Sequence, residues 1–146
     1  MLDRDQKVRI NTSFQALRLA PELFCRDFYE RLFRQAPSVR PLFPDDLDRQ
    51  AEKLASTLMV AIRSIHDLET LLPALHELGR RHASYGAMPV HYDVVGLVLI
   101  QTLAEHVPGW SGDDERAWSA LYRDLSGAML AGNSEESARC DTKKAG

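Results

Sequence analysis

The stretch LGRRHASYGAMPVHYDVVG, residues 78–96, decides the fold because it contains the end of one helix and the start of another. Four residues up to its break recur at steps of four, three and four positions, which is the spacing of one helical face. These residues are Leu71, Leu75, Leu78 and His82. Gly86 and Pro89 do not allow that helix to continue, and Pro89 suits the first turn of the next one. His82 therefore lies at the end of an apolar helical face.

The rest of the chain shows helical periodicity and almost no strand alternation, so we predict an all-α fold. Prolines, glycines and capping residues divide the chain into helices. The expected helices begin after Asp3, at Pro21, near Asp46, at Leu71, near Val90 and near Asp113. The last helix is expected to end near Leu130, so that residues 1–131 form one domain and the polar residues 132–146 a disordered tail.

Composition and charge limit the classes of function. The chain has 146 residues, of which 45% are hydrophobic and 27% charged, as in a single globular domain. A net charge of −3 and the lack of a basic cluster argue against nucleic-acid or membrane partners. No signal peptide or long apolar run is found, so we expect a cytoplasmic protein with Cys25 and Cys140 as thiols. Cys25 stands in an apolar stretch and is expected to fill the core.

The histidines are the main candidates for chemistry. None of them has a second histidine at the i, i+4 spacing of a helical zinc site; the five are His66, His76, His82, His91 and His106. Cys25 and the serines stand in no nucleophile motif, and no glycine-rich phosphate loop is found. Haem needs one axial imidazole from the protein, and a lone histidine on an apolar helix face meets that need. A core histidine without a ligand is the alternative interpretation of His82.

Four segments, in order along the chain, resemble those of bacterial single-domain globins and of the globin half of flavohaemoglobins. They are FYERLFRQAPSVRPLF (28–43), QAEKL (50–54), the opening stretch (78–96) and AWSALY (117–122). The sequence is also similar to Vitreoscilla-type haemoglobin, and the likeness extends over residues 4–131. The resemblance implies a globin fold, a three-over-three helical sandwich around haem b (iron protoporphyrin IX), in a monomer or a weak dimer.

On the side of the haem where a gas would bind, the resemblance implies roles for five residues. Tyr29 and Gln50 match the distal pair, whose O–H and N–H groups would donate hydrogen bonds to bound dioxygen. Leu54, four residues after Gln50, matches the apolar residue that crowds the gas. Phe43 matches the phenylalanine that packs on the haem face. Lys53 is placed either to reach a haem propionate or to lie in solvent. Without the resemblance, Tyr29 would be interpreted as a core residue and Gln50 as a surface residue.

On the other side of the haem, His82 matches the proximal histidine, which would bind iron through Nε2. Tyr92 matches a tyrosine that braces this histidine in flavohaemoglobins, together with a glutamate on the last helix. Counting on from AWSALY without a gap brings Asn133 near the place of that glutamate. An amide in place of a carboxylate makes the histidine a weaker electron donor, which weakens the analogy with oxygen activation. His91, beyond the helix break, is expected to take no part in binding.

The primary hypothesis is a haem protein that binds dioxygen reversibly, for storage or delivery, with nitric oxide and carbon monoxide as further ligands. The alternative is an enzyme, a nitric oxide dioxygenase that forms nitrate and depends on a separate reductase. A gas or redox sensor is a third hypothesis, and a helical interaction module without haem is a fourth. The sequence does not choose among storage, nitric oxide removal and sensing.

Overall fold

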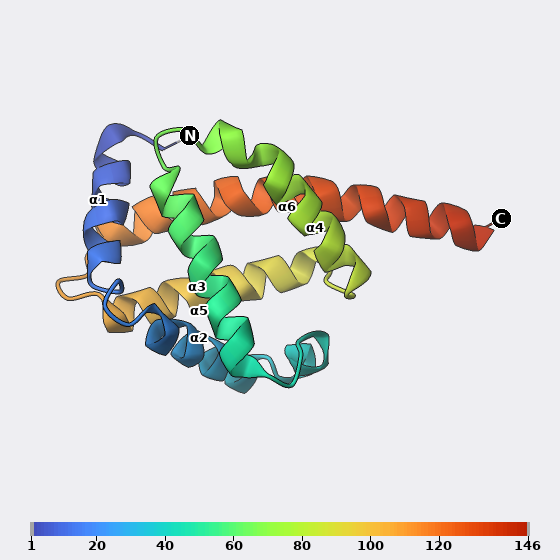
Figure 1. The fold of residues 1–146 in the computed structure, drawn as a ribbon, viewed down its shortest axis with the longest axis horizontal. Coiled ribbons are helices and arrows are strands. Elements are labelled where there is room, and N and C mark those ends of the chain that lie inside the picture. Colours follow the sequence, from blue (N-terminus) through green and yellow to red (C-terminus); the bar gives the residue numbers. More distant parts are fainter. Residues whose placement is uncertain (1, 146) are drawn as a thin grey trace.

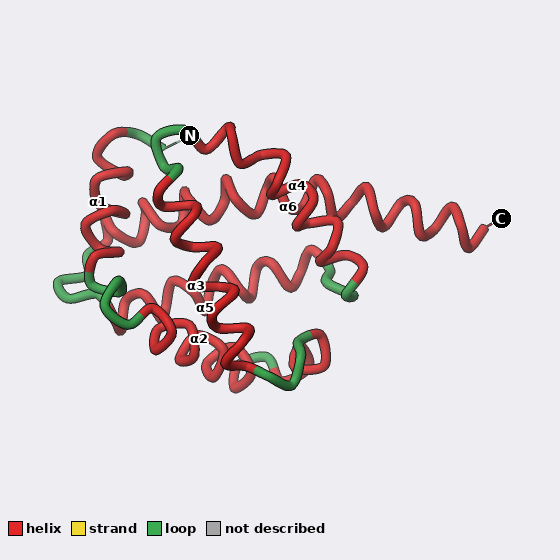
Figure 2. The backbone as a smooth tube through the Cα atoms, in the orientation of Figure 1, coloured by secondary structure: helices red, strands yellow, loops and turns green. Residues whose placement is uncertain are grey.

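The computed structural model describes residues 2–145, with side chains described for residues 2–139. Every regular element within this range is helical, which confirms the all-α prediction (Figure 2). In chain order the elements are α1 (Arg4–Gln15), α2 (Pro21–Gln35), the 3₁₀ helix η1 (Pro37–Leu42), α3 (Leu47–Arg63), the 3₁₀ helix η2 (Leu68–Leu71), α4 (Leu72–Ser84), α5 (Pro89–His106) and α6 (Gly112–Ala145).

The helices start where the sequence provides caps. Asp3 accepts a hydrogen bond from the backbone N–H of Gln6, while the Gln6 side chain bonds back to Asp3 N, so α1 opens on a capping box. The Asp46 side chain caps α3 by accepting a hydrogen bond from the backbone N–H of Arg49. Prolines open α2 and α5, where the missing N–H has no helical partner to lose. The helix starts expected near these residues are therefore confirmed.

The core lies where α2 packs on α3 and α5 while α6 packs on α1, α4 and α5 (Figure 1). Each of α1, α2, α3, α5 and α6 contributes fully buried apolar side chains, including Ile10, Phe24, Leu32, Ala51, Leu103 and Leu121. Burying a leucine or phenylalanine contributes about 1.5–3 kcal/mol, so this shared interior supplies most of the stability. Cys25 is fully buried in it, as expected.

Helix α4 is attached differently, by direct backbone contact with α6. A Cβ atom on Gly79 would lie 1.8 Å from the carbonyl oxygen of Met129, and one on Gly132 would lie 1.9 Å from the carbonyl oxygen of His76. No side chain larger than hydrogen fits at either point. The two glycines therefore fix the position of α4, and with it His82, which follows Gly79 by less than one turn.

The end of α6 differs from the expectation. The helix was expected to end near Leu130, but it continues to Ala145, and its last part projects beyond the other helices (Figure 1). Six of residues 133–139 are polar, and two of them pair with α4: Glu135 with His76 at 3.1 Å and Glu136 with Arg80 at 3.5 Å. A prediction based on apolar content does not detect such contacts. The division of the chain into residues 1–131 and 132–146 stays a prediction.

No single helix within residues 2–145 combines the length and the apolar character needed to cross a membrane. The segments Leu68–Ser84 and Pro89–His106 reach the length and apolar content of a membrane span only when they are taken together, and a bend of 113° separates them. Much of the apolar surface of the second segment is used in the core, where Val98 and Leu103 are fully buried.

The glycine contact between α4 and α6 gives a stability prediction. Gly79→Ala should lower the free energy of unfolding by about 2–3 kcal/mol, because the new methyl group collides with the backbone of α6. Gly127→Ala, on the exposed side of α6 with nothing within 4 Å, is the matched control. It should raise stability by roughly 0.5–1 kcal/mol, since alanine favours helix. Urea unfolding followed by circular dichroism measures both, and equal effects would contradict the close contact.

Candidate functional site

The first cluster joins α2 to α3 through Tyr29 and Gln50. The amide Nε2 of Gln50 donates a hydrogen bond to Tyr29 Oη at 3.3 Å. Tyr29 is 4% exposed, and within residues 2–139 no acceptor lies in hydrogen-bond reach of its hydroxyl hydrogen. Because the oxygen already accepts from Gln50, the O–H group is left to donate to a ligand. The structure thus brings together the two residues proposed as the distal pair.

Burial keeps this phenol protonated. Loss of solvent around the ring raises the pKa of Tyr29 to about 12, although the hydrogen bond from Gln50 opposes part of the rise. The neutral form is the one that carries a hydrogen to donate. Tyr29 is therefore a donor at every pH near neutrality.

Phe43 lies against the same tyrosine. Its ring centroid is 5.5 Å from that of Tyr29 and 5.3 Å from that of Phe33, with the rings edge to face in both pairs. This aromatic contact explains why a bulky apolar residue occurs in a segment broken by prolines. The neighbouring Leu42 reaches across to Gly86, where an added Cβ would be 3.3 Å from the leucine methyl group. The segment after α2 thus meets the turn that follows α4.

The other two residues expected on this side lie on α3. Leu54 is half-buried against the core one turn after Gln50. Lys53 is exposed, and its ammonium group has no bonded partner within residues 2–139. Both positions are compatible with the expected roles, and those roles stay predictions.

The second cluster surrounds His82 on α4. Its Nδ1 lies 2.8 Å from the carbonyl oxygen of Leu78, one turn earlier on the same helix. A carbonyl only accepts, so Nδ1 carries the hydrogen and Nε2 is left with a lone pair. Within residues 2–139, Nε2 has no hydrogen-bond or ion-pair partner. The imidazole is thus oriented with its metal-binding nitrogen free, which is the state a haem ligand needs.

Tyr92 on α5 lies beside His82, with 6.3 Å between the ring centroids. Asn133 on α6 donates through Nδ2 to Tyr92 Oη at 3.4 Å and to the carbonyl oxygen of Ala87 at 3.0 Å. Burial raises the pKa of Tyr92, and the hydrogen bond from Asn133 opposes that rise. The structure thus places Asn133 beside Tyr92, and its match to the glutamate of flavohaemoglobins stays a prediction.

His91 has a structural role that the sequence reading missed. Its Nδ1 accepts a hydrogen bond of 2.9 Å from the backbone N–H of Met88, the residue that precedes α5. The signal was the position of His91 as the third residue of α5, three residues after the N-cap Met88, where a side-chain acceptor completes a cap. Among the residues that the structure describes, no three histidine, cysteine, aspartate or glutamate side chains are grouped to hold a metal ion.

A comparison with known protein families identifies the family of the chain. The sequence model of the globin family matches residues 26–129, which include Tyr29, Phe43, Gln50, His82 and Tyr92. The chain belongs to the globin family. The expected fold is confirmed by a crystal structure as well: a bacterial globin from Campylobacter jejuni superposes with a TM-score of 0.78 at 22% sequence identity, covering 95% of this chain and 99% of that one.

Curated relatives of this globin include several flavohaemoproteins. The protein from Pseudomonas aeruginosa is 27% identical over 135 residues, which cover 89% of this chain and 34% of that protein. The one from Vibrio cholerae is 28% identical with the same coverage, and the one from Bacillus thuringiensis is 30% identical over 71% of this chain. The globin thus spans about a third of the length of the relatives it matches.

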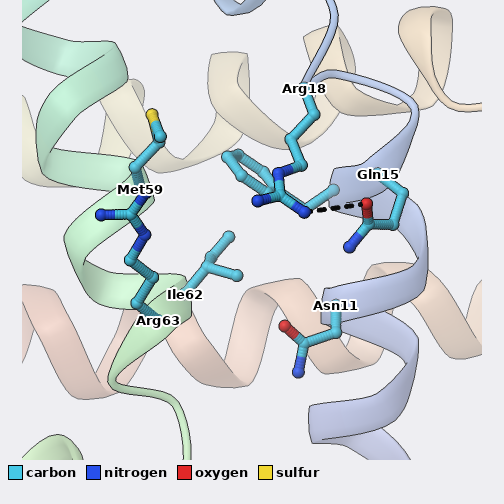
Figure 3. A pocket seen from close by; sticks show the side chains of 7 residues that line it. Asn11, Gln15, Arg18, Met59, Ile62 and Arg63 are labelled. Atoms are coloured by element: carbon cyan, nitrogen blue, oxygen red, sulfur yellow. Dashed lines mark hydrogen bonds between the residues drawn. The ribbon is translucent and has the colours of Figure 1, made fainter.

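A small cavity of about 100 Å³ lies away from both clusters, between α1 and α3 (Figure 3). Arg18 and Arg63 project toward it, and Arg18 donates to Gln15 at 3.3 Å. Both arginines follow or end a helix, where a cation offsets the negative end of the helix dipole. The cavity shares no residue with the two clusters.

The raised pKa of Tyr29 predicts a loss of stability at high pH. Above pH 10 the unfolded chain releases this proton while the folded chain keeps it up to about pH 12, so stability present below pH 10 is lost across that window. Two pKa units correspond to roughly 2–3 kcal/mol. In Tyr29→Phe, the free energy of unfolding should decline less as the pH rises above 10, because the titrating phenol is absent. Urea unfolding at pH 9, 10 and 11 measures it, and parallel curves would contradict the assignment.

Proposed function

We propose that this globin binds haem b through His82 and binds dioxygen reversibly on the side of Tyr29 and Gln50, with nitric oxide and carbon monoxide as further ligands. The observation that carries the proposal is the free Nε2 of His82, held in the metal-binding tautomer by the bond to Leu78. When bound, the haem supplies an iron with one position left for a diatomic gas.

The residues around His82 fit such a group. α4 packs extensively on α6, and within residues 2–145 it has no comparable contact with α3 or α5. The side of α4 that carries His82 is therefore not filled by the backbone of a neighbouring helix. Phe43, from the segment after α2, and Leu54, from α3, supply half-buried apolar surface for a flat macrocycle. His82 would bind the haem iron, and Phe43 would pack against the macrocycle.

Tyr29 and Gln50 stabilise the bound gas. Dioxygen takes up partial negative charge on binding, and a neutral phenol and an amide donate to it without carrying a charge of their own. Burial of Tyr29 keeps water away from the bond and makes it stronger than an exposed one. Carbon monoxide takes up less charge, so the pair favours dioxygen over it.

Asn133 favours reversible binding over oxygen activation. A carboxylate near a proximal histidine makes the imidazole more electron-donating, which helps to break the bond between the two oxygens. In this chain the polar group that bonds Tyr92 beside His82 is the neutral amide of Asn133. The imidazole therefore receives no anionic support from this direction.

A second function, nitric oxide dioxygenation, is favoured by the likeness to flavohaemoproteins, whose name denotes a flavin beside the haem. The reaction combines nitric oxide, dioxygen and one electron to give nitrate, so it needs a reductase that returns the electron. Tyr29 and Gln50 would hold the dioxygen during the attack. Nitrate formed over many turnovers with a supplied flavin reductase separates this role from storage.

The assignment of His82 predicts which histidine is needed for haem. His82→Ala should lose the Soret band of the haem-reconstituted protein, because no other side chain replaces Nε2, and added imidazole should restore it. His91→Ala is the control, since it removes a helix cap worth about 1 kcal/mol and leaves the band unchanged. Circular dichroism shows that both variants fold. A Soret band that survives in His82→Ala without imidazole would contradict the proposal.

The distal hydrogen bond predicts a change in gas release. Tyr29→Phe should raise the dioxygen dissociation rate about tenfold, which corresponds to one hydrogen bond of roughly 1.4 kcal/mol. Thr12→Val removes an exposed hydroxyl on α1, a helix that supplies neither cluster, and should have no effect. Stopped-flow replacement of dioxygen by carbon monoxide measures both rates. Equal rates for wild type and Tyr29→Phe would exclude a bond from this phenol.

A further inference from the structure

Arg40 makes an unusual set of contacts in η1, the short 3₁₀ helix between α2 and α3. Its Nη1 donates to two backbone carbonyl oxygens, that of Phe43 at 3.2 Å and that of Pro44 at 3.1 Å. Its guanidinium carbon lies 4.9 Å from the centre of the Phe33 ring, in a cation–π arrangement. Within residues 2–139 it forms no ion pair with a carboxylate. The charge of Arg40 is thus used on the backbone and on an aromatic face.

These contacts enclose Phe43 from both sides. The backbone carbonyl of Arg40 accepts from the N–H of Phe43 at 3.1 Å, while the Arg40 side chain donates to the carbonyl of Phe43. The segment has little other means of holding its shape, because Pro41 and Pro44 lack N–H groups and cannot extend a helical ladder. Phe33, on which the guanidinium lies, also contacts the Phe43 ring. Arg40 therefore fixes both the backbone and the ring of Phe43.

We propose that Arg40 is a positioning residue for the haem, which it serves by holding Phe43 in place against the macrocycle. The inference rests on the proposed function, since it assigns Phe43 to the haem face. The proposal concerns how firmly the chain retains haem and does not concern the chemistry of the haem. The Tyr29 ring also packs on Phe43, at 5.5 Å between centroids. Loss of the Arg40 contacts would therefore loosen the side of the haem that faces Tyr29 before it affects the side of His82.

Three variants distinguish the positioning role of Arg40 from an effect of its charge alone and from a general loss of stability. Arg40→Ala removes the two hydrogen bonds and the aromatic contact. Arg40→Lys keeps the charge but lacks the planar group that lies on Phe33 while donating to both carbonyls. Arg34→Ala is the matched control, because Arg34 is an exposed arginine at the end of α2 whose side chain has no bonded partner within residues 2–139.

The first measurement uses the full chain without added haem. Hydrogen exchange followed by mass spectrometry should show faster exchange in Arg40→Ala within residues 40–50, with protection of α5 and α6 unchanged. Arg40→Lys should show a smaller increase and Arg34→Ala none. No increase within residues 40–50 would overturn the proposal, and so would an increase spread over the whole chain, which indicates general destabilisation.

The second measurement uses the haem-loaded protein. Transfer of haem to an excess of a haem-scavenging apoglobin should be about tenfold faster for Arg40→Ala than for Arg34→Ala, with Arg40→Lys between them. Equal transfer rates for Arg40→Ala and Arg34→Ala would overturn the haem-positioning role. If the wild-type chain takes up no haem while the exchange result holds, the proposed function fails and the hold of Arg40 on Phe43 stands.

Discussion

The backbone contact between α4 and α6 is the constraint on which the position of His82 depends. Side chains normally keep helix axes 8–10 Å apart, whereas Gly79 and Gly132 let these two backbones touch. Within α4 only Leu75 and Gly79 are buried, so the helix has little other anchorage. His82 follows Gly79 by three residues, so the position of its ring depends on the position of this helix. Within residues 2–145, α4 makes no comparable contact with α3 or α5, so the backbones of those helices do not cover His82.

The extension of α6 supports the same contact, but its interactions differ in weight. The ion pairs from His76 to Glu135 and from Arg80 to Glu136 are partly exposed, and such pairs contribute about 0–1 kcal/mol each. Asn133 is 2% exposed and bonds two oxygens. Removing a buried donor of this kind leaves its acceptors unpaired, at a cost of about 1–3 kcal/mol. The Asn133 amide therefore contributes more to stability than the ion pairs do, and it bonds Tyr92 directly.

The sequence predicted the helices because they depend on local signals, and it singled out the candidate site residues, whose roles stay predictions. Prolines, caps and the three- and four-residue spacing of apolar residues locate the helix starts, and motif resemblance placed Tyr29, Gln50 and His82. The end of α6 was predicted wrongly because polar residues hold it, and polar contacts between distant segments leave no periodic pattern. The sequence did not predict the helix cap made by His91 or the hydrogen bonds from Arg40 to backbone carbonyl groups for a related reason. Each depends on a side chain that bonds a particular backbone group.

Both clusters use neutral groups where charged ones would also fit. Tyr29 stays protonated because burial raises its pKa, and Gln50 and Asn133 are amides, so within residues 2–139 no carboxylate is bonded to Tyr29, Tyr92 or His82. In the proposed function, neutral donors would stabilise the partial charge that a bound gas takes up without adding a charge of their own. An anionic group beside His82 would instead make the imidazole more electron-donating. If His82 holds haem, this distribution of charge favours holding a gas over transforming it, and turnover to nitrate would depend on electrons from a separate reductase.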